Sequence, residues 1–142
     1  MEHVAILSKK EKFLNKILKG TKTIESRWYS NKKTPYKNIS RGDIIYFKET
    51  GEPINVRCVV KKVLFVDILN EDNITEILNR FGNQIGIGKS YIVNLKNKRY
   101  CTLVFIKDVE KIKSFGINKA GFGNMAAWIT LDNIERIKVA GM

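Results

Sequence analysis

Apolar residues recur at helical spacing in two stretches of the chain. In residues 13–18 they follow a capping-box sequence at 8–11, and Gly20 is placed to end the helix. A second capping-box sequence, at 73–76, opens another apolar helical face that Gly82 closes. The pattern therefore predicts two short amphipathic helices, the first with lysines on its outer face.

Elsewhere the pattern is typical of strands separated by turns. Four segments have strand character: 21–28, 44–47, 54–66 and 99–109. Turn residues at 49–53 predict a hairpin between the second and the third. The third is long enough to bend, and the fourth is apolar on both faces, as a central strand would be. Residues 83–97 stay ambiguous, and the element around Ile134 and Ile137 is compatible with helix or strand.

Short strands interrupted by two or three helices predict an α+β fold around a small mixed or mostly antiparallel β-barrel. With 142 residues, 44% of them hydrophobic, the chain can bury its own core as a single domain spanning 1–142. It lacks a run of roughly 18 apolar residues and the apolar block of a signal peptide. We expect no membrane association and a cytoplasmic location.

Cysteine and histidine usage limits the chemistry. Cys58 and Cys101 each lie inside an apolar run without a second ligand at metal-binding spacing, so we expect buried thiols and no metal site. His3 is the single histidine, which nearly excludes histidine triads and histidine metal clusters. Any catalysis would depend on carboxylate, lysine, hydroxyl or thiol groups, and no cofactor is expected.

Positive charge is concentrated in the first third of the chain. The formal net charge is +12, and residues 1–48 hold twelve basic and four acidic side chains, a net of +8. Such an excess attracts polyanions, of which nucleic acids are the commonest in cells. Within this third, the polar loop at 29–41 carries four candidate contacts to a phosphate backbone: Lys32, Lys33, Lys37 and Arg41. The alternative is that the lysines reflect an AT-rich genome and only solvate the surface.

Two glycine-rich segments resemble nucleotide-binding motifs incompletely. Residues 86–90 lack the first glycine of a P-loop, and too little chain follows 121–126 to complete a dinucleotide fold, so we reject both motifs. Lys119, Phe122 and Asn124 nevertheless combine cation, aromatic ring and amide in a way that suits a stacked base. The alternative places Phe122 in the core, together with Trp128, and we expect Trp28 to be mostly buried.

The order of motifs in the first third resembles the ASCH domain of the PUA-like superfamily. A helix ends in Gly20, the sequence Lys-Thr-Ile-Glu-Ser-Arg follows at 22–27, and Gly42-Asp43 precedes the next apolar strand. The resemblance implies a barrel with a ligand cleft beside the first helix and strand. ASCH members have been assigned RNA binding, transcription coactivation, ribonuclease activity and hydrolysis of acylated cytidine. The resemblance therefore implies a ligand class more than a reaction.

The motif residues can also be interpreted chemically. Strand alternation places Thr23, Glu25 and Arg27 on one face. Arg27 offers a planar donor fork for phosphate or a base edge, Glu25 can accept from a base amine or ribose hydroxyl, and Lys22 adds a point charge. We predict that Lys22, Glu25 and Arg27 bind a nucleotide. The alternative is an ion pair of Glu25 and Arg27 on an open sheet face.

Two functional hypotheses follow. The first is a non-catalytic module that binds RNA or a nucleotide-like ligand. The second is a small cofactor-independent hydrolase acting on a modified nucleoside or RNA, with Lys22, Thr23 and Glu25 as its catalytic candidates. Acyl-cytidine hydrolases resemble this chain at Lys22 and Arg27 but have a threonine nucleophile where Glu25 stands, which weakens the second hypothesis; Thr23 is the substitute nucleophile it would need.

Overall fold

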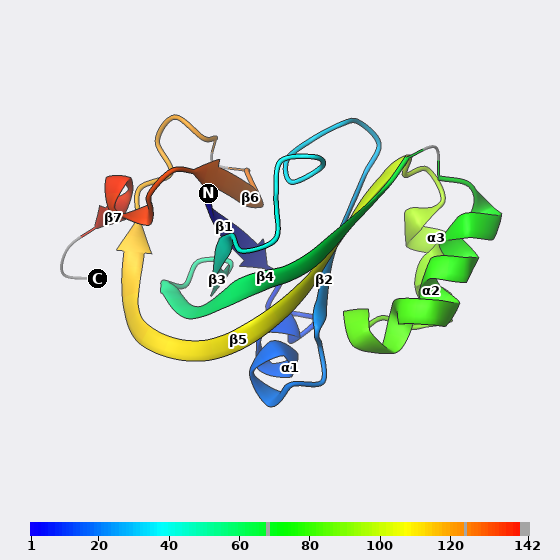
Figure 1. Ribbon diagram of the computed structural model, residues 1–142, viewed down its shortest axis with the longest axis horizontal. Coiled ribbons are helices and arrows are strands. Elements are labelled where there is room, and N and C mark those ends of the chain that lie inside the picture. Colours follow the sequence, from blue (N-terminus) through cyan, green and yellow to red (C-terminus); the bar gives the residue numbers. More distant parts are fainter. Residues whose placement is uncertain (68, 124, 140–142) are drawn as a thin grey trace.

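In the computed structural model, residues 1–67, 69–123 and 125–139 are described (Figure 1). The elements in chain order are β1 (Glu2–Leu7), α1 (Phe13–Lys19), β2 (Ile24–Tyr29), β3 (Ile44–Glu49), β4 (Ile54–Val66), α2 (Glu71–Ile85), the 3-10 helix η1 (Lys89–Tyr91), α3 (Ile92–Leu95), β5 (Tyr100–Ile117), β6 (Trp128–Leu131), the 3-10 helix η2 (Ile134–Arg136) and β7 (Lys138–Val139).

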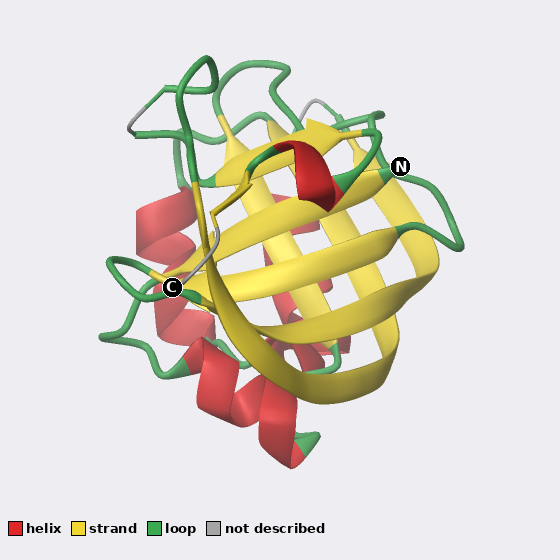
Figure 2. Cartoon of the chain, turned by 90° about the vertical axis from the view of Figure 1, so that its left-hand side faces the viewer, coloured by secondary structure: helices red, strands yellow, loops and turns green. Residues whose placement is uncertain are grey.

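The strands form one curled sheet (Figure 2). Their order is β2-β5-β4-β3-β1-β6, with β7 paired to the end of β5. β1 and β3 run parallel, and the other pairs are antiparallel. Register shifts between β4 and β5 bend these two long strands, because each bulge increases local twist. The mixed half-barrel with helices against it confirms the predicted α+β fold around a small mixed β-sheet barrel, including the hairpin of β3 and β4 and the central position of β5.

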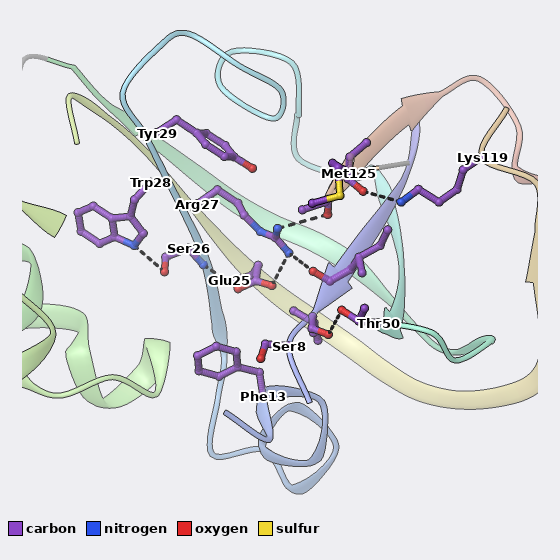
Figure 3. Close-up of a pocket in the computed structure, with 14 residues that line it drawn as sticks. Ser8, Phe13, Glu25, Ser26, Arg27, Trp28, Tyr29, Thr50, Lys119 and Met125 are labelled. Atoms are coloured by element: carbon purple, nitrogen blue, oxygen red, sulfur yellow. Dashed lines mark hydrogen bonds and ion pairs between the residues drawn. The ribbon is translucent and has the colours of Figure 1, made fainter. Parts of the chain in front are cut away.

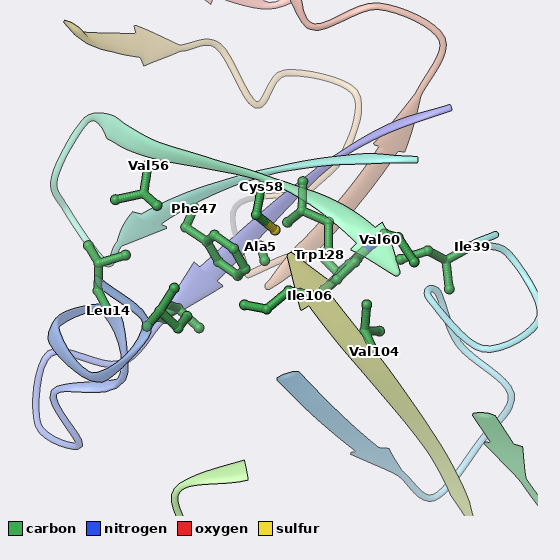
Figure 4. Close-up of a cluster of buried hydrophobic side chains, with 13 residues drawn as sticks. Ala5, Leu14, Ile39, Phe47, Val56, Cys58, Val60, Val104, Ile106 and Trp128 are labelled. Carbon is green, nitrogen blue, oxygen red and sulfur yellow. The ribbon is translucent and has the colours of Figure 1, made fainter. Parts of the chain in front are cut away.

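The interior of the curl holds the largest apolar cluster (Figure 4). Alternate residues of β4, including Cys58, point inward against Phe47 and Trp128, which is 6% exposed. Cys101 is buried on the opposite face of β5, beneath α2. Both thiols are free and buried, as predicted, and burial raises the pKa of Cys58 to about 12, so this thiol is unreactive near neutral pH.

Helix boundaries differ from the prediction at both capping boxes. The Ser8 hydroxyl accepts from the Lys10 amide and caps no helix; α1 begins after Lys12, although it does end at Gly20 as predicted. α2 begins one turn earlier than predicted, at the Asn70 cap, where Asn70 and Asn73 bond each other's amides at 2.8 and 2.9 Å.

Three further features differ from the prediction. α2 continues through Gly82, where a Cβ would come within 3.0 Å of the Ile87 carbonyl oxygen, so this glycine permits close packing and does not end the helix. The ambiguous 83–97 segment forms the end of α2, η1 and α3, and β1 was not predicted at all. No helix in the described part of the chain is long and apolar enough to cross a membrane.

Candidate functional site

A cavity of about 510 Å³ lies where the two edges of the curled sheet approach each other (Figure 3). β2 forms one wall, and the end of β1, Thr50 and residues 125–127 form the other. We call this space the seam cavity. Its walls are mainly apolar, and the charged groups that line it come from Glu25, Arg27 and Lys119.

The Arg27 side chain reaches from the β2 wall of the seam cavity to the opposite wall. Its Nη2 donates to the Ile6 carbonyl at 3.1 Å and to Glu25 Oε2 at 3.3 Å, while Nη1 donates to the Ala127 carbonyl at 3.3 Å. The side chain is 12% exposed. A guanidinium has five N–H donors. The bonds to described residues engage three of these, which leaves two N–H groups without a bond to a described residue.

Glu25 is a fixed anion beside this guanidinium. It is 3% exposed, and its Oε1 accepts from the Ser26 amide at 3.0 Å and lies 3.3 Å from Lys22 Nζ. Burial alone would raise the pKa of Glu25, but the charges of Lys22 and Arg27 outweigh it and lower this pKa. The carboxylate therefore stays ionised near neutral pH and orients donors around it.

Lys22 is buried away from the cavity. Its Nζ donates to the carbonyls of Ile24 at 2.9 Å and Ile85 at 2.6 Å, and with Glu25 these give the three ammonium protons three acceptors. Burial lowers the pKa of Lys22 although Glu25 opposes the shift. The amine thus joins β2 to the end of α2. We call Lys22, Glu25 and Arg27 the charged cluster.

The motif at 22–27, called the hallmark from here on, supplied four predicted site residues, and the structure brings two of them, Glu25 and Arg27, together in the seam cavity. It does not bring Lys22 or Thr23 there. Thr23 is exposed, precedes β2, and donates its backbone amide to the Gln84 carbonyl at 2.9 Å. The three candidates for catalysis therefore do not converge on one space.

Residues 30–41, called the basic loop below, leave the cavity wall directly after Tyr29. Lys32, Lys33, Lys37 and Arg41 are all exposed, as contacts to a phosphate backbone would have to be. Lys33 Nζ lies 5.1 Å from the centre of the Tyr29 ring, at the cavity wall. The loop thus carries cations outward from the rim of the cavity.

Tyr36 anchors this loop to the sheet. It is buried, and its ring centroid lies 5.6 Å from that of Phe65 on β4 and 5.1 Å from that of Tyr100 on β5. These tilted and edge-on contacts are the favoured geometries of aromatic pairs. The anchor holds the middle of the loop against the outer end of β4 and β5 while its lysines face solvent.

The glycine-rich segment contributes less than predicted. Lys119 lines the cavity, and its Nζ donates to the Ala126 carbonyl at 2.9 Å. Phe122 is 37% exposed and lines neither the cavity nor the core, whereas Trp128 belongs to the core. Asn124 lies outside the described residues. Trp28 is partly buried and donates to the Ser26 hydroxyl at 2.9 Å.

The sequence did not predict several of the residues that line the cavity. Ser8, Thr50 and Met125 come from three separate segments that only the fold brings together. Tyr29 could have been assigned to this site, because it lies two residues after Arg27 and therefore on the same strand face. In the described residues, no group of three or more His, Cys, Asp or Glu could hold a metal ion.

A search of solved structures finds the ASCH protein of Zymomonas mobilis, with a TM-score of 0.70 and 16% sequence identity, over 95% of this chain and 90% of that one. The chain has the fold of an ASCH domain. Two single-substitution variants of the same bacterial protein match at TM-scores of 0.70 with 16% and 17% identity, covering 95% of this chain and 93% and 91% of theirs.

No protein-family model and no curated protein matches the sequence. The resemblance drawn from the hallmark residues is thus confirmed at the level of the fold. Because one fold hosts many activities, the functional argument for this ASCH fold depends on the seam cavity and its surroundings.

Proposed function

We propose that this ASCH fold is a binding module for RNA or a nucleotide-like ligand. The ligand occupies the seam cavity, and adjoining phosphates contact the basic loop. The observation that carries the proposal is the continuity of the two features at Tyr29, whose ring lines the cavity and lies under Lys33. A nucleotide needs such a combination of aromatic wall and nearby cations.

The size and charge of the site support the same ligand class. Its volume of about 510 Å³ is within the roughly 300–1,000 Å³ of small-ligand pockets. Arg27 retains donors for a phosphate or base edge, and Lys119 adds a cation on the opposite wall. A net charge of +12 would attract a polyanion to this face from a distance.

Hydrolysis has weaker support. Glu25 is held ionised by its neighbours, so it has no proton to give near neutral pH. The Lys22 amine is bonded to two carbonyls and a carboxylate, and Thr23 lies outside the cavity. We therefore place binding ahead of catalysis. A single domain over 1–142 and a cytoplasmic location, where RNA is abundant, fit such a module and stay predictions.

Titration with a short fluorescently labelled single-stranded RNA tests the proposal. The variant Lys32→Gln/Lys33→Gln/Lys37→Gln should bind more weakly, and its plot of log affinity against log salt should be shallower by about 2 if all three lysines contact phosphates. The matched control, Lys107→Gln/Lys111→Gln/Lys113→Gln, removes the same charge from exposed positions on β5. Equal losses in the two variants would show that only net charge matters.

A further inference from the structure

A buried tryptophan supports the arginine of the seam cavity. Trp128, the first residue of β6, is 6% exposed, and the centre of its ring lies 5.1 Å from Arg27 Cζ. A guanidinium is held in place when its face contacts an aromatic ring and its edge donates to fixed acceptors. The ring of Trp128 and the carbonyls of Ile6 and Ala127 meet both conditions.

His3 in turn fixes Trp128. The indole Nε1 donates to His3 Nδ1 at 3.1 Å, and His3 is fully buried. Because an indole nitrogen can only donate, Nδ1 must accept, and the ring proton of neutral His3 is assigned to Nε2. That nitrogen lies 2.8 Å from Asp43 Oδ2, to which it donates, while the Thr130 hydroxyl lies 2.9 Å from Nδ1.

These hydrogen bonds require the His3 imidazole to be neutral. Among the described residues, the charged groups facing His3 are the Asp43 carboxylate and, beyond it, the Met1 amino group 3.3 Å from Asp43 Oδ1. Burial lowers the pKa of His3 from 6.5, although Asp43 opposes the shift. A proton added to Nδ1 would remove the lone pair that accepts from the Trp128 N–H, and the Thr130 hydroxyl, 2.9 Å away, is the acceptor within reach of the new proton.

The same carboxylate also holds the end of the basic loop. Asp43 Oδ2 accepts from the Ser40 amide at 3.0 Å, in addition to His3. A chain of contacts therefore runs from the loop through Asp43, His3 and Trp128 to Arg27. Both parts of the proposed binding site depend on one polar network, which is buried at His3 and Trp128 and exposed at Ser40.

We propose, building on the binding function above, that His3 and Trp128 are positioning residues for the ligand: neutral His3 fixes the Trp128 ring, which fixes the guanidinium of Arg27 in the seam cavity. The expected pH dependence of affinity is opposite to the one that net charge alone would give. Adding a proton to a protein of net charge +12 should strengthen anion binding by simple attraction. Here acidification below pH 6.5 should weaken it.

The test measures affinity for a labelled single-stranded RNA from about pH 5 to 8 at constant ionic strength. The wild type should lose affinity as the pH falls. His3→Asn supplies an oxygen acceptor without titrating, so its affinity should lack this acid-dependent loss. Trp128→Phe keeps an aromatic face but loses the indole N–H, and should bind about fivefold more weakly at neutral pH, the effect of one hydrogen bond.

Two measurements separate positioning from general destabilisation. Ile129→Ala alters the next residue of β6, which packs in a different apolar cluster, and should lower stability without changing RNA affinity or its pH profile. In the ligand-free wild type, the Trp128 indole N–H resonance should shift over the pH range in which affinity falls.

The outcomes are distinguishable. A pH-dependent loss of affinity that accompanies the indole shift and is absent from His3→Asn supports the inference. If the wild type binds RNA but His3→Asn keeps the acid-dependent loss and Trp128→Phe keeps the wild-type affinity, or if both change only as Ile129→Ala does, the inference is wrong while the proposed function stands. If the wild type binds no RNA at any pH, the proposed function fails and the inference fails with it.

Discussion

The charged cluster and the basic loop carry the same kinds of side chain in different physical settings. In the cluster, Lys22 and Glu25 are 1% and 3% exposed, and each charge is matched by a partner within the protein. In the loop, the side chains of Lys32, Lys33 and Lys37 are in solvent, and their nearest described partners are aromatic rings. The cluster stabilises the fold around the cavity, whereas the loop leaves its charge available to a ligand.

This difference shows that motif membership alone does not reveal whether a charged side chain is paired inside the protein or exposed. Lys22 belongs to the ASCH-like hallmark, yet its amine bonds the end of α2 and the start of β2. The loop lysines belong to no motif and are free to approach phosphates. Variants of the cluster should therefore lose more stability than variants of the loop.

The largest loss should come from Lys22→Met. The substitution keeps the approximate volume of the side chain but leaves Glu25 without one of its cations and two buried carbonyls without a donor. Removing one partner of a buried pair costs about 3–5 kcal/mol of unfolding free energy. Urea unfolding followed by circular dichroism measures it, with Lys32→Met as the control, expected within about 0.5 kcal/mol of wild type. Similar losses of unfolding free energy in both variants would show that Lys22 contributes no more to stability than an exposed lysine.

Arg27→Lys should have the next largest effect. Lysine keeps the charge but cannot reach the Ile6 and Ala127 carbonyls and Glu25 with a planar fork, so the seam loses bonds worth about 2 kcal/mol in total. The matched control is Arg136→Lys, whose exposed pair with Asp132 contributes little. Thermal unfolding of both variants gives the difference, and equal shifts in Tm would argue against a structural role for the seam contacts.

Acid should weaken the cluster by a smaller amount. The folded-state pKa of Glu25 lies below its ordinary value of 4.5, so its contribution to stability is present above that pH and is lost as the pH falls through the folded value. Unfolding free energies measured over this acid range should fall more steeply for wild type than for Glu25→Gln. Parallel curves would show that Glu25 does not contribute through its charge.

The smallest loss should come from the basic loop itself. Replacing Lys32, Lys33 and Lys37 together by glutamine should change the unfolding free energy by less than about 0.5 kcal/mol, because the ammonium groups are in solvent. Urea unfolding alongside the RNA titration checks this point. A large loss would mean that the loop is a structural element like the cluster.

Local patterns predicted most of the fold. The turn at Gly42-Asp43, the hairpin of β3 and β4, and the two-faced apolar β5 all follow from residue spacing and were found. β1 was missed because Val4, Ala5, Ile6 and Leu7 form an apolar run without turn residues in front of it, and its parallel pairing with β3 depends on chain far away in sequence.

The site was predictable only where one strand determines it. Alternation placed Glu25 and Arg27 on one face, and they do lie together in the cavity. The burial of Lys22 depends on the Ile85 carbonyl, 63 residues away, and the opposite wall depends on Ala127, 100 residues from Arg27. Strand period carries no information about such distant partners. The same holds for His3, which meets Trp128 across 125 residues.

The most direct test of the account is to map RNA contacts on the protein by NMR. Titration of isotope-labelled protein with a short single-stranded RNA should shift the Arg27 side-chain N–H signals and the amides of Tyr29, Ala127 and the basic loop. Amides of β5 around Lys111, on the far part of that long strand, should stay unchanged. Shifts confined to the loop would remove the seam cavity from the binding site, and shifts confined to regions outside both would contradict the account.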